Sequence, residues 1–502
     1  MTELSTPAPN LEGARTNLGA EKRYRNIAVT VVVLGVTMSG IDTSAVVLGL
    51  PVMMRDLHTD ILSMVWVIMA YLLVITILGT QVGRLGDMFG RVRMYNIGFA
   101  SFTFGSLLCG LSASGPELIG FRVAQGIGGA LISSNSGAVI ADTFPPNERG
   151  KAYGMTGTGW SLGAILGILV GGAFVTFLSW RYIFFINLPI GIVATTVGVI
   201  VLKERSPRIQ ATFDIGGMVV LGAALFFLLY GMTNITGSGF GAEYVTEIAF
   251  GLTLLPAFVV YEKNRSSPLL DLSLLKERVL TASIFAAFLQ SLASFAVLFL
   301  VVMYLQGPRG MTPWNASLLL VPGYILGGMI APFSGRLSDR LGARIIATIG
   351  LGLQICGFLV YLTLASSTST YTVIVGAILN GAGSSSFFPA NNSAVMASAP
   401  RQSYGVVSGL LRTLASVGMV CSFAVALLVA SLSIPRQTAF EIFLGVGGIN
   451  GQLSSAFING MHTALVASVT VLIVAVVLSV SRGKEARTIK AQRENPTQWS
   501  SK

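Results

Sequence analysis

Charged residues are scarce in this chain. Only 11% of its 502 residues are Asp, Glu, Lys or Arg, whereas 53% are hydrophobic, and the mean hydropathy is +0.75. A chain of this length with so little charge cannot enclose its apolar residues in one water-soluble core under a polar surface. The composition therefore excludes an ordinary soluble protein and indicates a polytopic membrane protein.

Cysteine and histidine are also rare, with three and two residues. Cys109, Cys356 and Cys421 all lie in apolar runs, and His58 and His462 are far apart in the sequence. These placements support neither a disulfide framework nor a zinc site. We expect no metal and no cofactor.

Two sequence signals are missing as well. No Gly-x-x-x-x-Gly-Lys-Ser/Thr loop occurs, so ATP-driven transport is not supported, and the polar loops are too short to hold the catalytic domain of an enzyme. No signal peptide is predicted, because the basic stretch 15–25 leads into an apolar run that is longer than a signal-peptide core and lacks a cleavage site. We expect the first apolar run to act as the targeting element.

Fourteen apolar runs are long enough to cross a bilayer as helices, which requires about 20 residues each. We place these spans near residues 27–50, 62–82, 94–113, 117–142, 151–177, 182–202, 214–233, 244–261, 281–305, 314–334, 345–365, 371–397, 404–430 and 461–481. The fold class predicted from them is an all-α polytopic membrane protein.

The basic residues between these spans alternate from loop to loop. Most of them fall on the side of the amino terminus, and only Arg55, Arg181, Arg309 and Arg436 fall on the other side. By the positive-inside rule, both termini are predicted to be cytoplasmic, in a multi-pass protein of the plasma membrane. The net charge of +11 is thus explained by the basic residues of the cytoplasmic loops and tails. Nucleic acid is not an expected partner, because it would need a basic, water-exposed face.

A charged, glycine-rich stretch occurs twice. Residues 83–93 read GRLGDMFGRVR, and residues 335–344 read GRLSDRLGAR, with the same opening, the same acid position and a later glycine. Glycines allow a tight turn between close helices, and an acid there can cap a helix or pair with arginine. The repeat indicates a duplicated chain with one hinge in each half. An ordinary charged cytoplasmic loop is the alternative.

The duplication predicts the domain organisation. We expect a cytoplasmic tail at 1–26, a six-helix bundle at 27–202, a linker with two extra membrane helices at 203–280, a second six-helix bundle at 281–481, and a cytoplasmic tail at 482–502. The spans of the linker carry no charge in their middle, which favours a lipid-facing spacer. The outer loop 431–460 is predicted to be the longest on its side.

Asp42 is the only acid well inside any predicted span. A carboxylate in the hydrocarbon is costly and is a functional-site hypothesis by default. From their positions along oppositely directed spans, Asp42 and Arg122 lie at nearly the same depth. Burial disfavours the ionised carboxyl group and a nearby arginine favours it, so such a pair can change protonation with conformation. A static ion pair that only fixes helix packing is the alternative.

The span 151–177 carries four glycines at intervals of four residues, Gly159, Gly163, Gly167 and Gly171. They share one face of a helix, and small residues at this spacing permit very close approach of a second helix. We predict that this face is a packing surface.

Taken together, these motifs resemble the major facilitator superfamily, in its fourteen-helix drug:proton antiporter branch. The resemblance rests on the first hinge and, beyond it, on Asp42 with Leu50-Pro51, on the RVAQG run 122–126, on the FPPNERGKA run 144–152 and on the WRYIF run 180–184. The second half matches more loosely. The branch has proline directly after the third of the four glycines, where this chain has Ile168. That difference weakens the inference of antiport.

The resemblance implies a latch at the first hinge. Its acid would dock at the start of the span 404–430, near Tyr404-Gly405, and its arginine would pair with Asp142. No acid lies between Ala394 and Arg401 to play that part in the second half, so an asymmetric latch is predicted. The latch residues expected are Gly83, Arg84, Gly86, Asp87, Gly90, Arg91, Asp142 and Asp339.

Polar and aromatic residues in other spans are candidates for contact with a substrate. They are Gln125, Phe288, Gln290, Phe295, Asn380, Phe387, Phe388 and Arg412. Core packing, lipid contact or a snorkelling arginine would explain the same residues.

The function predicted is a monomeric secondary transporter that exports hydrophobic or amphipathic compounds, including drugs, in exchange for protons by alternating access. Asp42 would be the proton site and Arg122 would adjust its protonation. Transport of an anionic metabolite or lipid-like molecule by Arg122 and Arg412 is the alternative. A membrane sensor that transports nothing is a remote one.

Overall fold

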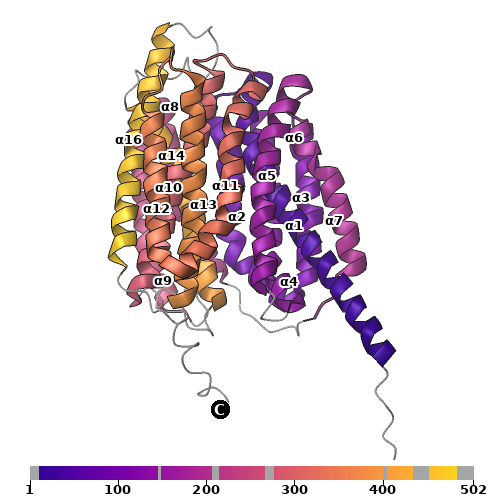
Figure 1. The fold of residues 1–502 in the computed structure, drawn as a ribbon. Coiled ribbons are helices and arrows are strands. Elements are labelled where there is room, and N and C mark those ends of the chain that lie inside the picture. Colours follow the sequence, from indigo (N-terminus) through magenta and orange to yellow (C-terminus); the bar gives the residue numbers. More distant parts are fainter. Residues whose placement is uncertain are drawn as a thin grey trace, which may run out of the picture.

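The chain forms a bundle of long helices. The computed structural model describes residues 11–144, 149–205, 214–265, 276–398, 404–432 and 451–482, and every regular element in these ranges is a helix (Figure 1). The helices are α1 (Leu11–Asp56), α2 (Ile61–Phe89), α3 (Arg91–Leu111), α4 (Gly115–Thr143), α5 (Arg149–Phe177), α6 (Tyr182–Phe185), α7 (Asn187–Val201), α8 (Ile215–Ser238), α9 (Ala242–Lys263), α10 (Arg278–Gln306), α11 (Pro313–Leu341), α12 (Ala343–Tyr361), α13 (Thr370–Ser398), α14 (Tyr404–Ser431) and α16 (Gly451–Ser481).

The predicted all-α class is confirmed, whereas the number of spans is not. Within the described residues, 13 segments are long and apolar enough to cross a membrane, and α6 and α7 together form one of them, Tyr182–Val201. Helix α4 is absent from this set, although it has 29 residues. Its sequence is rich in glycine, serine and other polar residues, which lower its hydropathy.

Several helices extend beyond the spans predicted from hydropathy. Helix α1 covers Leu11–Asp56, where 27–50 was predicted, and α16 begins at Gly451, ten residues before the predicted 461. Hydropathy marks only the part of a helix that suits hydrocarbon, and polar turns can continue the same helix into the interface. The middle of the predicted outer loop, residues 433–450, lies outside the described residues.

Both hinges differ from the predicted multi-residue turn. Helix α2 continues to Phe89 and α3 begins at Arg91, so a single residue, Gly90, separates them. Gly342 separates α11 from α12 in the same way. The φ angles of these glycines are 107° and 97°, a region that side chains with a Cβ rarely adopt. One glycine in each half is therefore sufficient to reverse the chain.

Helices α1 to α7 pack mainly on one another, and so do α10 to α16. We call the end of the helices that holds Gly90 and Gly342 the inner end, which was predicted to be cytoplasmic, and the opposite end the outer end. The two groups meet where α5 packs on α11 and α2 packs on α14. At the outer end, the backbone N–H of Trp314 donates to the Thr176 hydroxyl at 3.0 Å, and Gln306 Nε2 donates to the Leu48 carbonyl at 3.0 Å.

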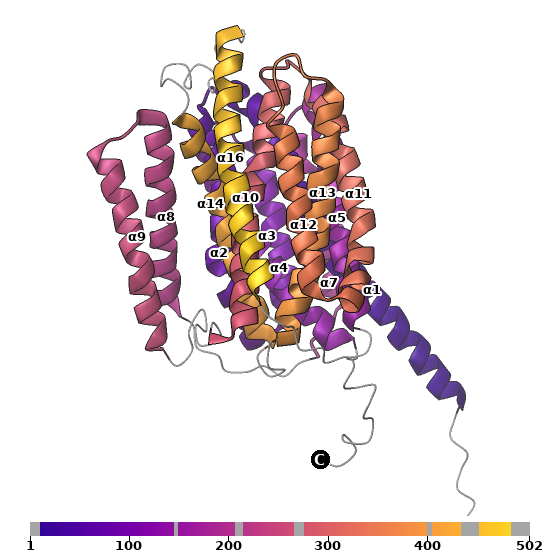
Figure 2. The same ribbon diagram turned by 60° about the vertical axis from the view of Figure 1, so that its left-hand side comes forward.

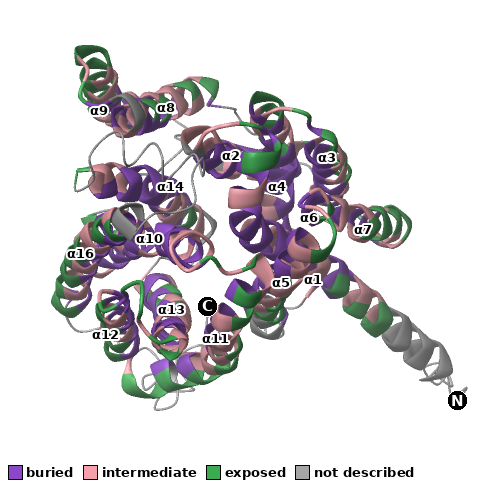
Figure 3. Cartoon of the chain, turned by 90° about the horizontal axis from the view of Figure 1, so that it is seen from above, coloured by how far each residue is buried: buried purple, intermediate pink, exposed green. Residues whose placement is uncertain are grey.

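The extra hairpin α8–α9 stands at one edge of the molecule (Figures 2 and 3). Helix α8 packs on α2 and on α14, one helix from each half, whereas α9 packs on α8 and has a largely exposed surface. At the inner end of the hairpin, Asp214 caps α8 by accepting the Gly217 N–H at 2.9 Å, and the Tyr261 hydroxyl of α9 donates to the same carboxylate at 3.2 Å. The hairpin, for which a lipid-facing spacer was predicted, therefore touches both halves through α8.

Candidate functional site

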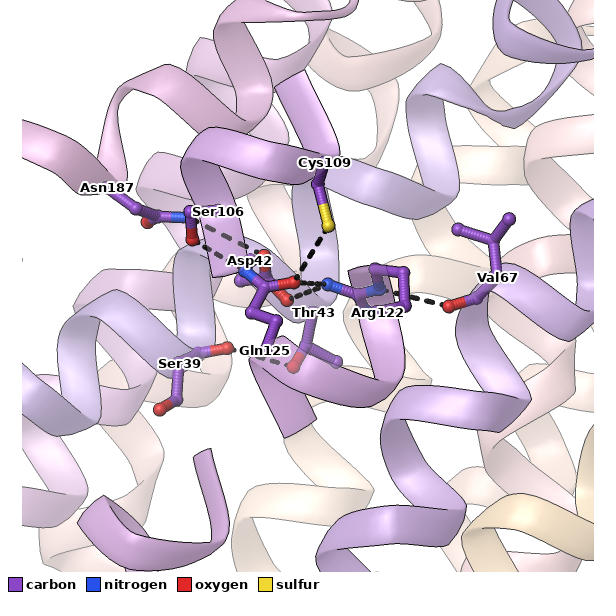
Figure 4. A network of polar contacts seen from close by, with 9 residues as sticks. All are labelled: Ser39, Asp42, Thr43, Val67, Ser106, Cys109, Arg122, Gln125 and Asn187. Carbon is purple, nitrogen blue, oxygen red and sulfur yellow. Dashed lines mark hydrogen bonds and ion pairs between the residues drawn. The ribbon is translucent and has the colours of Figure 1, made fainter. Parts of the chain in front are cut away.

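A buried ion pair lies in the middle of the first helix group. Arg122 Nη1 of α4 is 2.7 Å from Asp42 Oδ2 of α1, and the two side chains are 1% and 0% exposed (Figure 4). Each ion is thus removed from water, which is costly unless its partners replace the lost hydration. The structure brings together the two charges that the sequence singled out.

Three amide and hydroxyl side chains complete the surroundings of Asp42. Gln125 Nε2 donates to Asp42 Oδ1 at 2.9 Å and to Ser106 Oγ at 2.7 Å. Asn187 Nδ2 reaches the same oxygen atoms at 3.5 Å and 3.3 Å. Asp42 therefore contacts side chains of α4 and α7, and Ser106 of α3 accepts hydrogen bonds from the same two amides (Figure 4). Ser106 and Asn187 were missed as site residues, because neutral polar residues are not conspicuous in an apolar run.

Arg122 has partners that do not depend on Asp42. Its Nε donates to the Val67 carbonyl of α2 at 3.0 Å, and its Nη1 also donates to Gln125 Oε1. Its guanidinium lies 4.1 Å from the centre of the Tyr71 ring, a cation–π geometry. The arginine thus keeps a carbonyl, an amide and an aromatic face even when the carboxyl group loses its charge.

The four-glycine face of α5 packs directly on α1 beside this site. A Cβ on Gly163 would lie 2.3 Å from the Thr37 carbonyl, and one on Gly167 would lie 2.6 Å from the Ile41 carbonyl. Gly159 and Gly171 meet α1 one turn to either side. Because Ile41 precedes Asp42, this close contact fixes the backbone that carries the carboxylate.

The first hinge contains a compact charge cluster. Arg91 Nε donates to Asp87 Oδ1 at 2.8 Å, and Arg91 Nη1 is 2.7 Å from Asp142 Oδ1 at the end of α4. The arginine therefore links α2, α3 and α4 at the inner end. The acid was predicted to dock near Tyr404 and Gly405; the surroundings of these two residues lie outside the described part of the chain, and so does the side chain of Asp339.

The remaining residues of the first hinge have separate contacts. A Cβ on Gly86 would meet the Asn135 side chain of α4 at 1.9 Å, whereas Gly83 has nothing within 4 Å. Arg84 is half-buried. Glu204, after α7, accepts the Arg93 N–H at 2.8 Å and lies over Gly90. Glu204 was missed because only the tertiary structure brings the end of α7 to the start of α3.

The candidate substrate residues fall into two groups. Phe387 is fully buried where α13 packs on α12, and Gln290 is 1% exposed and donates to Gln354 Oε1 at 3.3 Å, inside the second helix group. Gln125 is fully buried in the Asp42 site. These positions fit packing and internal hydrogen bonding better than direct contact with a substrate in this conformation. The partly exposed candidates are Phe288, Phe295, Asn380 and Phe388.

Arg412 lies on α14 with an exposed side chain, and its Nη1 donates to the Ser133 carbonyl of α4 at 2.9 Å. This bond joins the two helix groups. The arginine is therefore placed at the boundary between them, which fits neither a simple snorkelling position nor burial inside one group.

Comparisons with known proteins agree with one another. The family model described as Major Facilitator Superfamily matches residues 32–423. The riboflavin transporter RibZ of Clostridioides difficile (strain 630) is 30% identical over 402 residues, which cover 79% of this chain and 86% of that protein. The tetracenomycin C resistance and export protein of Streptomyces glaucescens is 28% identical over 501 residues, 93% of each chain.

A solved structure has the same fold. It is a bacterial homolog of the human lysosomal transporter Spinster in an inward-facing and occupied conformation. The TM-score is 0.67 with 17% sequence identity, and the match covers 93% of this chain and 98% of that one.

Proposed function

This chain belongs to the major facilitator superfamily, and we propose that, within this family of transporters, it exports hydrophobic or amphipathic compounds in exchange for protons. The observation that carries the proposal is the buried Asp42–Arg122 pair. It is an acid with a charged partner in the membrane interior, where such groups commonly serve as ion or proton sites. Export is also what the name of the tetracenomycin C relative describes.

The contacts of the pair support a change of protonation at Asp42. A proton added to Asp42 Oδ2 would neutralise the carboxylate and weaken its attraction to Arg122. The arginine would still be held by Val67, Gln125 and Tyr71, so no cation would be left without partners. Asp42 and Gln125 couple α1 to α4, and protonation would thereby loosen one helix from another.

The rest of the transport cycle is proposed from the fold. The two six-helix bundles would rock around a central site between them, with both termini in the cytoplasm and the protein acting as a monomer in the plasma membrane. Arg91, Asp87 and Asp142 would latch the inner end, where they already form one charge cluster. The contacts between Gln306 and Leu48 and between Trp314 and Thr176 would have to break to open the outer end.

Uptake into inverted membrane vesicles tests the proposal. A pH gradient is imposed, and uptake of ethidium, a lipophilic cation, is compared with that of fluorescein, an organic anion. We expect gradient-driven ethidium uptake that is lost in Asp42→Asn and kept in Asp60→Asn. Asp60 is a matched control because it caps α2 away from the pair, and asparagine caps a helix equally well. An Asp42→Asn variant that responds to the gradient like the wild type would contradict the proposal.

The second candidate function is transport of an anionic metabolite or lipid-like molecule. It is favoured by the position of Arg412 between the two helix groups. Uptake of fluorescein alone, lost in Arg412→Ala, would support it. Indifference to every imposed gradient would instead favour a sensor.

A further inference from the structure

A cavity at the inner end lies outside the site described above. It has a volume of about 460 Å³ and lies between the first two turns of α10 and the last turn of α16, two helices that pack side by side (Figure 2). The lining residues are Arg278, Thr281, Ala282, Phe285, Leu478 and Ser481. We call it the α10–α16 groove.

The polar and apolar residues of the groove are arranged by depth. On α10, Arg278 lies at the helix start and Phe285 lies two turns deeper, and positions 278, 281, 282 and 285 share one face. On α16, Ser481 is the last residue and Leu478 lies one turn deeper. Each helix therefore has a polar group at its end and an apolar group toward the middle of the bundle, the order of a lipid head group and its acyl chain.

The charge at the mouth of the groove is positive. Arg278 is exposed and forms no hydrogen bond or ion pair with another described residue. Lys276, an exposed lysine, lies two residues before Arg278, and Arg482, which is buried, follows Ser481 directly. Glu277, the acid there, is used as the cap of α10 and accepts the Leu280 N–H. The N–H groups of the first turn of α10 add further positive potential.

We propose that the α10–α16 groove binds one anionic phospholipid of the surrounding membrane. Its phosphate would pair with Arg278, and an acyl chain would cover Phe285 and Leu478. The Ser481 hydroxyl donates to the Leu478 carbonyl at 3.1 Å, so Arg278 is the residue that sets the preference for negative charge. Basic pockets between membrane helices on the cytoplasmic side are known to hold such head groups. The bound lipid would join α10 to α16 and stabilise the second helix group.

Lipid titration of the purified full-length chain in detergent tests this. Binding of phosphatidylglycerol and of phosphatidylcholine is counted by native mass spectrometry. A second measurement locates the site. Phe285→Trp introduces a tryptophan into the groove, and brominated forms of the same lipids should quench its fluorescence when they bind there. The quenching of the native tryptophans in the wild type is subtracted as background. We expect phosphatidylglycerol to bind about fivefold more tightly, the effect of one basic residue at an anionic surface. Arg278→Gln should abolish the preference, and added salt should reduce it.

Arg340→Gln is the matched control. Arg340 is also an exposed arginine at the inner end, in the last turn of α11, but it does not line the groove. Its substitution should leave the preference intact. Equal binding of the two lipids by the wild type, a preference that survives Arg278→Gln, or displacement of phosphatidylglycerol by inorganic phosphate at equal concentration would each overturn the proposal. The readout is binding, so it is independent of whether protons drive transport.

Discussion

At the scale of single residues, Arg122 holds the greatest number of different partners in the site. It contacts a carboxylate, a backbone carbonyl, an amide and an aromatic ring, and its own side chain is only 1% exposed. Partners of this kind offset the desolvation of a buried cation. In the proposed transport cycle, these partners would hold the arginine in place when the carboxyl group of Asp42 takes up a proton.

Because Asp42 and Arg122 depend on each other's charge while buried, single and double substitutions of the pair should differ in stability. Arg122→Met leaves Asp42 buried without its cation and should lower the free energy of unfolding by about 3 kcal/mol. The double variant Asp42→Leu with Arg122→Met replaces both ions by apolar groups and should recover most of that loss, yet it should show no transport driven by a pH gradient. Thermal and denaturant unfolding in detergent measure the first effect. A double variant as unstable as the single one would contradict the argument.

At the scale of elements, the α1–α5 contact positions the site. The glycines of α5 meet the α1 backbone at successive turns, so the separation of the helices is set by the absence of side chains. A Cβ that lies under 3 Å from a carbonyl of the facing backbone forces the helices apart.

The prediction for this contact concerns Gly163→Ala. The new methyl group would lie 2.3 Å from the Thr37 carbonyl, and we expect a loss of about 2 kcal/mol of stability, within the range for overpacked cores. Transport should fall as well, because Asp42 would move with α1. Gly157→Ala on the same helix is the control, since nothing lies within 4 Å of its Cβ position. Equal unfolding temperatures for the two variants would refute the packing role.

The inner end of the α8–α9 hairpin gives a pH prediction. Burial raises the pKa of Asp214, but hydrogen bonds from the Gly217 N–H, from the Glu262 carboxyl group in its protonated form and from the Tyr261 hydroxyl outweigh it and hold the pKa below the usual 3.8. A lowered pKa stabilises the folded state above pH 3.8, and this contribution is lost as the pH falls through the folded value.

We therefore expect Asp214→Ala to cost about 1 kcal/mol at pH 7, as for other helix caps. The difference from the wild type should shrink below about pH 4. Unfolding in detergent across a pH series measures it, with Glu243→Ala, at an exposed position in the first turn of α9, as the control. A cost that does not change with pH would show that the carboxylate charge is irrelevant.

At the scale of the whole molecule, the two halves are alike in chain path and different in charge. Gly90 and Gly342 reverse the chain in the same way, but the arginine of the first hinge has two acids, Asp87 and Asp142. No acid occurs from Ala394 to Arg401 at the end of α13. The inner end is thus expected to be latched from one half only.

The prediction at this scale compares the two hinges. Asp87→Asn removes one charge from the cluster and should shift the population toward the state that is open at the inner end. Cysteine probes placed in the outer half should then react more slowly, by about fivefold for a loss of about 1 kcal/mol. Asp339→Asn, the matched change in the second hinge, should have a smaller effect. Probe rates unchanged by Asp87→Asn would rule out the latch.

The sequence by itself determined the all-α class, the repeat and the residues of greatest chemical interest. Long apolar runs can only be membrane helices, and a lone Asp42 or Arg122 in such a run is conspicuous because charge there is expensive. The repeat of the hinge sequence located Gly90, and the spacing of four residues located the four-glycine face of α5. These features follow from local composition and spacing, which do not depend on the rest of the fold.

Only the tertiary structure decided which side chains meet. Ser106, Asn187 and Glu204 join the charged residues because helices distant in sequence pack together. Gln290 and Phe387 proved to be enclosed in the second helix group, since hydropathy does not tell which face of a helix is turned inward. The true ends of α1, α2 and α16 were also hidden, because a helix continues through polar turns once its hydrogen bonds are formed. Which side chains contact each other and which face of a helix is buried depend on how the helices pack, and no single segment of the chain determines that packing.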